Sequence, residues 1–198
     1  LTDVPKCSSG RAPDPAALSA RRQEGRRGAA LALGSTGEVG FGGWVDGELE
    51  VTLSGRGEVA WWIRYFRPEV VLAHDPWKRY RIHPDHRAAG FLACDGIVAA
   101  RDPHFFPEHD VEPWRPSTLL LFEADEPDHI EDVTHWVEPK LNALECHESQ
   151  FETTMFKDLG EVASEREAFR ARERELTAAM GGPAGFAHGE AFKLVDDL

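Results

Sequence analysis

Residues 69–74 read EVVLAH and residues 84–100 read PDHRAAGFLACDGIVAA, with a polar and aromatic loop over residues 75–83 between them. The first segment is a short apolar run without alternation, which is typical of a strand covered on both faces. The second begins with a proline suited to a first helical turn and continues with apolar residues to about Ala100, which predicts a helix. Strand, loop and helix together make a βα unit.

The same pattern recurs on both sides of this unit. Strands are predicted at residues 118–122 and 129–133, with a shorter one at 39–41 in a glycine-rich stretch. Alternating strands and helices indicate an α/β fold with a mostly parallel sheet, helices on both faces and ligands beyond the carboxyl ends of the strands. The remaining segments are predicted helices at residues 13–33, 59–66, one through Leu141 and Leu144, and 164–176, and a loop at 181–189.

Composition narrows the classes of partner. The chain of 198 residues is 41% hydrophobic, which suits one domain, and its net charge of -13 argues against nucleic acid and anionic membranes. No apolar run approaches the roughly 20 residues that span a bilayer, and no signal peptide opens the chain. Cys7, Cys94 and Cys146 are widely spaced and odd in number, so neither a disulfide framework nor a thiolate zinc site is expected. We therefore expect a cytoplasmic protein; its oligomeric state is not readable, and a homo-oligomer is compatible with the sequence.

The segment with the most chemical content is His83-Pro84-Asp85-His86, which follows a predicted buried strand and opens a helix. Two histidines three residues apart at a helix start can face one pocket, and a carboxylate between them can orient an imidazole ring. This combination suits a metal site, although two histidines are fewer than the three protein ligands that a catalytic zinc usually has. The alternative is that these residues only cap a helix.

Several short motifs together resemble the PIG-L/LmbE-like deacetylases. His74-Asp75-Pro76, followed by residues 83–90 (HPDHRAAG), resembles the second signature of that family. Upstream, residues 21–24 (RRQE) resemble its Arg-x-x-Glu helix, and residues 44–49 (WVDGEL) resemble its Asp-Gly loop. Downstream, residues 100–103, 126–129 and 144–150 match in order and spacing. The resemblance covers about residues 1–156.

The resemblance implies a Rossmann-like fold and a zinc ion that activates water to attack the acetamide carbonyl of an N-acetylglucosamine-type substrate, releasing acetate and a free amine. By the same resemblance His86 is a zinc ligand, His83 stabilises the oxyanion or protonates the leaving amine, and Asp85 tunes His83. Arg21 and Asp46 match residues that contact the sugar. Their alternative interpretations are a solvated helix arginine and a turn-forming Asp-Gly. His74, at a strand end, either lines the site or shapes the turn.

One departure from the family affects the function. The family begins with a strand ending in an Ala-His-Pro-Asp-Asp-type motif that supplies two zinc ligands and the general base, and this sequence does not contain it. Residues 1–3 resemble the end of the family's second strand. We therefore expect one domain over residues 1–198, incomplete at its N-terminus, which alone neither holds zinc tightly nor deacetylates.

Three functions remain open at this stage. The leading hypothesis is a de-N-acetylase for a small N-acetylglucosaminyl conjugate. A metal amidohydrolase of another amide is the alternative among enzymes, because the motifs indicate the metal and not the acyl group. A non-catalytic remnant or sugar-binding module is the alternative from a different class.

Overall fold

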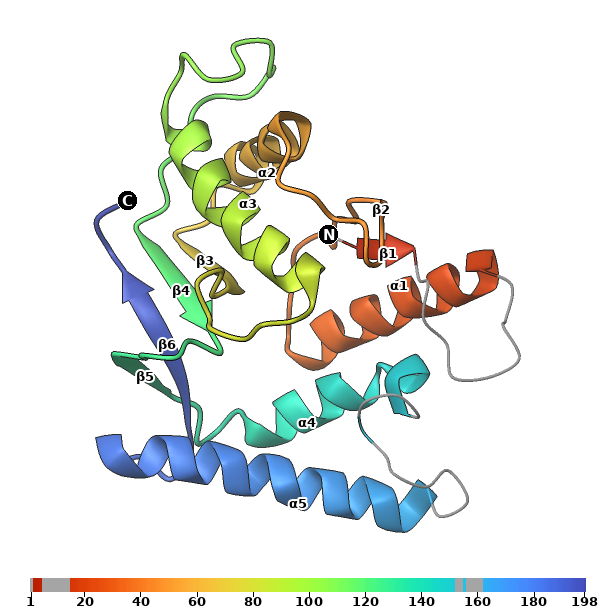
Figure 1. Ribbon diagram of the computed structural model, residues 1–198. Helices are drawn as coiled ribbons and strands as arrows, with labels where there is room; N and C mark the ends of the chain where they lie inside the picture. The colour runs from red at the N-terminus through yellow and green to blue at the C-terminus, as the bar shows by residue number, and fades with distance from the viewer. Residues whose placement is uncertain (1, 5–14, 152–154, 156–161) are drawn as a thin grey trace. The chain divides into compact units, whose positions relative to one another are not determined.

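The computed structural model describes residues 2–4, 15–151, 155 and 162–198 and confirms the α/β class (Figure 1). The predicted helices and strands form with small shifts of their ends, except that the strand expected at residues 39–41 is replaced by β2 slightly downstream. In chain order the elements are β1 (Thr2–Val4), α1 (Pro15–Ala32), β2 (Trp44–Val45), α2 (Leu53–Phe66), β3 (Val70–His74), α3 (Pro84–Arg101), β4 (Thr118–Phe122), β5 (His129–Asp132), α4 (Val137–Glu145), η1 (Glu148–Gln150), α5 (Val162–Gly181), η4 (Gly182–Ala184) and β6 (Gly189–Val195).

The described residues form two sheets. The larger has the order β3-β4-β6-β5, in which β3 and β4 are parallel and β6 is antiparallel to β4. The smaller pairs β1 with β2 in parallel. Strand β6 was not predicted from the sequence; it pairs with β4, with Leu119 opposite Val195. Its insertion makes the larger sheet mixed at this point.

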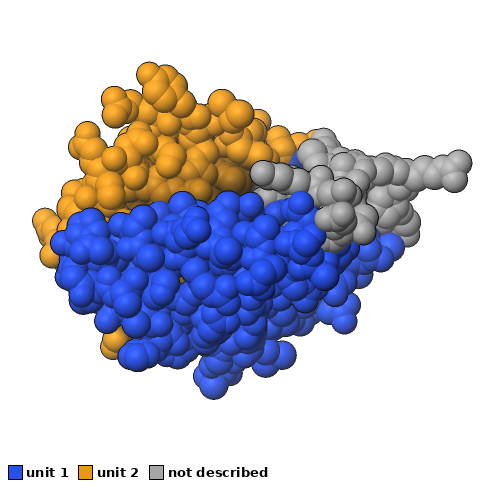
Figure 2. Space-filling view, turned by 90° about the horizontal axis from the view of Figure 1, so that it is seen from below, with its two compact units in different colours: residues 1–46, 130–190 blue, residues 47–129, 191–198 orange. Residues whose placement is uncertain are grey.

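The chain divides into two compact units, coloured separately in Figure 2. One contains residues 1–46 and 130–190, and the other contains residues 47–129 and 191–198. Cys7 and most of the segment that joins β1 to α1 lie outside the described residues. A single domain over residues 1–198 therefore stays a prediction.

In the second unit, α2 and α3 pack together on the sheet. Ile63 of α2, Ile97 of α3 and Leu121 of β4 belong to one buried core cluster. The two helices approach closely because residue 96 is glycine: a Cβ there would lie 2.5 Å from Val59 Cγ1. Thr52 caps the start of α2 by accepting a hydrogen bond from the Gly55 N–H at 3.0 Å. The two helices thus share one buried core with β3 and β4.

Strand β3 departs from the expectation of a strand covered on both faces. Val70 is 43% exposed and Leu72 is 58% exposed, whereas Ala73 on the opposite face is buried in the core. In the described part of the chain β3 is an edge strand with β4 as its neighbour, and the buried core lies on one face only. The apolar run without alternation therefore predicted the strand correctly, but the prediction that both faces of the strand are covered was wrong.

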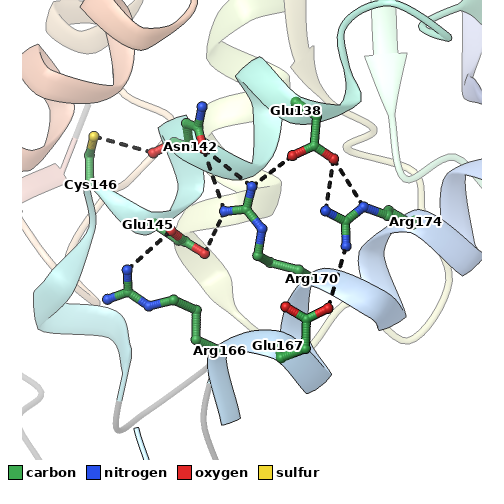
Figure 3. A network of polar contacts seen from close by, with 8 residues as sticks. All are labelled: Glu138, Asn142, Glu145, Cys146, Arg166, Glu167, Arg170 and Arg174. Atoms are coloured by element: carbon green, nitrogen blue, oxygen red, sulfur yellow. Dashed lines mark hydrogen bonds and ion pairs between the residues drawn. The ribbon is translucent and has the colours of Figure 1, made fainter. Parts of the chain in front are cut away.

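In the first unit, α4 and α5 pack through Val137, Leu141 and Phe169, and a set of ion pairs joins them at the surface (Figure 3). Arg170 lies between two carboxylates of α4, with Nη2 2.8 Å from Glu138 Oε2 and Nη1 2.8 Å from Glu145 Oε1.

Among the described residues, no helix has the length and apolar character needed to cross a membrane.

Candidate metal centre

Three metal-ligating side chains converge where β3 and β4 end. His74 is the last residue of β3, Glu123 follows β4 directly, and His86 lies in the first turn of α3. One donor atom from each of the three lies within 4.8 Å of the others. Because β3 and β4 are parallel and in register, with His74 opposite Phe122, their carboxyl ends meet at one edge. The structure therefore places His86 beyond the carboxyl end of β3, as predicted.

The histidine rings form a stack. The His74 and His86 ring centroids are 4.2 Å apart and those of His83 and His86 are 4.7 Å apart. This packing requires α3 to approach the end of β3 closely, and Gly90 permits it, since a Cβ at that position would lie 2.5 Å from the His74 carbonyl oxygen. The glycine of the HPDHRAAG segment thus sets the spacing between strand end and helix.

The surroundings of the cluster favour neutral imidazoles. Burial, followed by the charges of His86 and Arg81, lowers the pKa of His74 to about 4. Burial and the neighbouring His83 likewise lower the pKa of His86. Burial alone would raise the pKa of Glu123, but hydrogen bonding and charge from Arg81 outweigh it and hold that pKa below its ordinary value. At neutral pH both imidazoles are therefore neutral and the Glu123 carboxyl is ionised. Neutral imidazole and carboxylate are among the ligand types that zinc prefers.

One donor of the cluster lacks a hydrogen bond. His74 Nδ1 is buried and has no hydrogen-bond partner, and its nearest acidic neighbour, Glu123 Oε2, lies 3.5 Å away. Arg81 contacts the other two members: its Nη1 lies 2.7 Å from His86 Nδ1, and its Nη2 forms an ion pair with Glu123. A buried ring nitrogen without a partner, aimed among two further donors, fits a metal ion in this position.

Asp85 does not belong to the cluster of donors, and its contacts are with backbone. The side chain is 3% exposed, and its carboxylate accepts hydrogen bonds from the Gly47 N–H at 2.7 Å and the Leu49 N–H at 3.3 Å. Asp85 thereby fixes the Asp-Gly loop to the start of α3. Its predicted effect on His83 stays a prediction.

The two residues predicted to contact the sugar, Arg21 and Asp46, have different surroundings. Asp46 lies 3.5 Å from Arg22 Nη1, with side chains 18% and 17% exposed respectively, whereas Arg21 is an exposed residue of α1. On a helix, neighbouring residues point about 100° apart, so only one of the two arginines can face Asp46. The sugar-contacting roles of Arg21 and Asp46 stay predictions.

Two members of the donor cluster were not assigned from the sequence as ligands. His74 was left between a pocket role and a turn role, and Glu123 was not considered. Glu123 is exposed and has a left-handed φ of 58°, so its local sequence gives no sign of a buried ligand. The usable signal is its place directly after a predicted strand parallel to the one that ends at His74.

Known proteins are similar to this chain both in sequence and in structure. Residues 6–96 match the family described as PIG-L: GlcNAc-PI de-N-acetylase. A diacetylchitobiose deacetylase of Thermococcus kodakarensis is 35% identical over 139 residues, which make up 68% of this chain and 51% of the relative. The chain thus spans about half the length of that curated relative.

Solved structures support the same grouping. An N,N'-diacetylchitobiose deacetylase from Pyrococcus horikoshii, complexed with an inhibitor, has a TM-score of 0.83 at 26% identity, covering 98% of this chain and 70% of that one. A 4-carboxy-2-hydroxymuconate hydratase from Pseudomonas putida has a TM-score of 0.69 at 19% identity over 94% of this chain and 76% of its own, which shows a shared fold alone. The fold is Rossmann-like, and the chain belongs to the PIG-L family.

Proposed function

We propose that this protein is a zinc-dependent hydrolase that removes the acetyl group from an N-acetylglucosamine-type sugar. The observation that carries the proposal is the convergence of His74, His86 and Glu123 at the carboxyl ends of two parallel strands. The names of its relatives agree, since two of them are diacetylchitobiose deacetylases.

Zinc held by this cluster would act as a Lewis acid toward the acetamide carbonyl and lower the pKa of a water molecule. His86 is the ligand that the family resemblance implies, and His74 and Glu123 are the donors that lie beside it. His83 precedes α3 and stacks on His86. This position supports the proposed role of His83 in stabilising negative charge on the acyl oxygen or giving a proton to the leaving amine.

Substrate orientation falls to the Asp-Gly loop. Gly47 follows Asp46 directly in the chain and is held by Asp85, one residue before His86. This connection supports a role for Asp46 in binding sugar hydroxyls. Arg21 stays the arginine that the family resemblance proposes for the sugar, and Arg22 forms an ion pair with Asp46.

The general base is not assigned to a residue of this sequence. The Ala-His-Pro-Asp-Asp-type motif that supplies it in the family is absent from residues 1–198, and the chain spans about half of its curated relative. We therefore propose no turnover for residues 1–198 alone, and turnover for a chain that carries these residues together with such a motif. Because three possible ligands lie together, the metal affinity of residues 1–198 can be measured separately from turnover.

The test measures metal content after dialysis and acetate release from N,N'-diacetylchitobiose by a chain that carries residues 1–198 together with that motif. His86→Ala should lose both metal and turnover, whereas His83→Ala should keep its metal and lower kcat by about 100-fold, because its role lies in the transition state. His104→Ala, which changes an exposed loop histidine, is the matched control. Metal retained by His86→Ala would contradict the ligand assignment. Sugar binding without acetate release would instead support a binding module.

A further inference from the structure

Arg81 binds two members of the donor cluster directly. Its Nη1 lies 2.7 Å from His86 Nδ1, and its Nη2 forms an ion pair with Glu123 Oε2. A guanidinium has only N–H groups to offer and stays protonated, so the ring nitrogen of His86 accepts this hydrogen bond. Neutral His86 therefore carries its proton on Nε2 and gives the lone pair of Nδ1 to Arg81.

This hydrogen bond excludes a metal ion on His86, whichever ring nitrogen the metal takes. Zinc binds an imidazole nitrogen at about 2.1 Å, along the lone pair. An ion on Nδ1 would therefore overlap with the guanidinium nitrogen that lies 2.7 Å from the same atom. Zinc on Nε2 would require the ring proton on Nδ1, where it would point at an N–H of Arg81. Arg81 must leave His86 when a metal binds there.

The surroundings of Arg81 allow its side chain to withdraw. Tyr80 is 95% exposed and Ile82 is 90% exposed, whereas the side chain of Arg81 between them is 11% exposed. The two exposed neighbours leave solvent beside Arg81 for another rotamer of its long side chain. The backbone is held from α3, since Arg87 donates a hydrogen bond to the Arg81 carbonyl oxygen. Withdrawal therefore needs a change of rotamer and no change in the path of the chain.

Lys78 provides a contrast within the same loop. Its Nζ donates to the Glu123 carbonyl oxygen at 2.7 Å, which is a backbone atom and not a possible ligand atom of the cluster. Lys78 thus brings a positive charge near the cluster, as Arg81 does, through a contact that a metal ion would not have to break. Comparing the two cations separates the effect of charge from the effect of occupying a ligand atom.

We propose that Arg81 is a built-in competitor of the metal ion, which occupies His86 in the metal-free protein, leaves it when zinc binds and so lowers the metal affinity of the site. The inference rests on the metal centre of the proposed function and concerns its regulation. Only the fraction of molecules in which Arg81 has left His86 can bind zinc, and the apparent dissociation constant rises accordingly. Removing Arg81 should therefore strengthen zinc binding, whereas removing a residue that only supports the fold would weaken it.

The first experiment measures zinc dissociation constants by competition with a chromophoric chelator, in the chain used to test the proposed function. Arg81→Met keeps a long side chain without its N–H groups and should bind zinc about tenfold more tightly, the lower end of the effect of one hydrogen bond to a charged group. Lys78→Met, the matched control, should change the constant by about twofold or less. Unchanged or weaker binding by Arg81→Met, or an equal gain in Lys78→Met, would overturn the inference.

The second experiment uses the wild-type chain and does not depend on the folding of a variant. With histidine and arginine side chains labelled with 15N, NMR should show His86 protonated on Nε2 in the metal-free protein. Saturating zinc should change the guanidinium signals of Arg81 and leave those of Arg170, whose contacts are with α4, unchanged. A proton on Nδ1 of metal-free His86, or Arg81 signals that zinc does not change, would count against the competition.

Failure of the proposed function gives a different result. If the wild-type chain binds zinc but releases no acetate, the deacetylase assignment fails, and the zinc affinities of wild type and Arg81→Met still decide the inference. Acetate release together with unchanged zinc affinity in Arg81→Met would keep the function and overturn the inference alone. Zinc binding by Arg81→Met and not by wild type would support the inference. If neither protein binds zinc, the metal centre and the inference fail together.

Discussion

The α4–α5 network and the His74–His86–Glu123 cluster both gather ionisable side chains, but they treat charge in opposite ways. In the network, hydrogen bonds to Glu145 and then Glu138 raise the pKa of Arg170, and hydrogen bonds from Arg174 and Arg170 lower the pKa of Glu138, so each group is held in its charged form (Figure 3). In the cluster, burial and neighbouring cations push the histidines toward their neutral form. Charges satisfied internally stabilise a fold, whereas converging neutral donors are available to a ligand.

The largest expected difference between the two regions is in metal affinity. His74→Ala and Glu123→Ala should each weaken zinc binding about 100-fold, at the upper end of the effects seen for metal-site residues. Arg170→Ala should leave the affinity unchanged, because its contacts are all within the network. Competition with a chromophoric chelator measures each dissociation constant. Unchanged zinc affinity in both cluster variants would show that neither His74 nor Glu123 is a zinc ligand, and would leave His86 as the one assigned ligand.

The second difference concerns pH. The folded-state pKa of His74 is about 4 against an ordinary value of 6.5, so between these values the unfolded chain binds a proton that the folded chain does not. Stability of the metal-free protein should therefore be constant above pH 6.5 and fall as the pH is lowered toward 4. Between pH 6.5 and about pH 4.5 the α4–α5 network should not change the pH dependence of stability. The pKa of Glu138 is lowered, so the stabilisation that this carboxylate provides is lost only at lower pH.

Urea unfolding at pH 7 and pH 5 checks this assignment. His74→Gln should flatten the slope, apart from the part that His86 contributes. Glu138→Gln should lower stability at both pH values equally. A slope that survives His74→Gln undiminished would place its origin elsewhere.

The smallest effects lie within the network and depend on exposure. Glu145→Ala removes a carboxylate that is 13% exposed from an arginine that is 17% exposed, and should lower the free energy of unfolding by about 1–2 kcal/mol. Arg166→Ala, whose side chain is 45% exposed, should cost about 0.5 kcal/mol or less. Chemical denaturation at pH 7 resolves the two. Equal losses of unfolding free energy in the two variants would show that burial does not determine how much each ion pair stabilises the fold.

The sequence predicted most of the fold because most of it is local. The EVVLAH strand and the helix after Pro84 form as expected, since apolar runs and a helix-start proline act within a few residues. Strand β6 was missed because its pairing with β4 is set by residues more than 70 positions away. The exposure of Leu72 was missed for a related reason: which strand stands at the edge of a sheet is a property of the whole chain.

In the candidate site too, local motifs could be read from the sequence, whereas contacts between distant residues could not. His86 could be assigned from a contiguous motif, but Glu123 enters only through the register of β3 with β4. The ion pair between Arg22 and Asp46 likewise joins residues 24 positions apart and could not be predicted from either motif alone.

The carboxylate of Asp85 has a consequence for how such proteins are recognised from sequence. It ties Gly47, whose φ is 85°, to the first turn of α3, so the Asp-Gly loop and the HPDH segment act as one unit although 38 positions separate the bonded residues. A side chain at position 47 would strain the loop in that conformation. Searching for both segments together should therefore find genuine relatives among chains in which either segment alone occurs by chance.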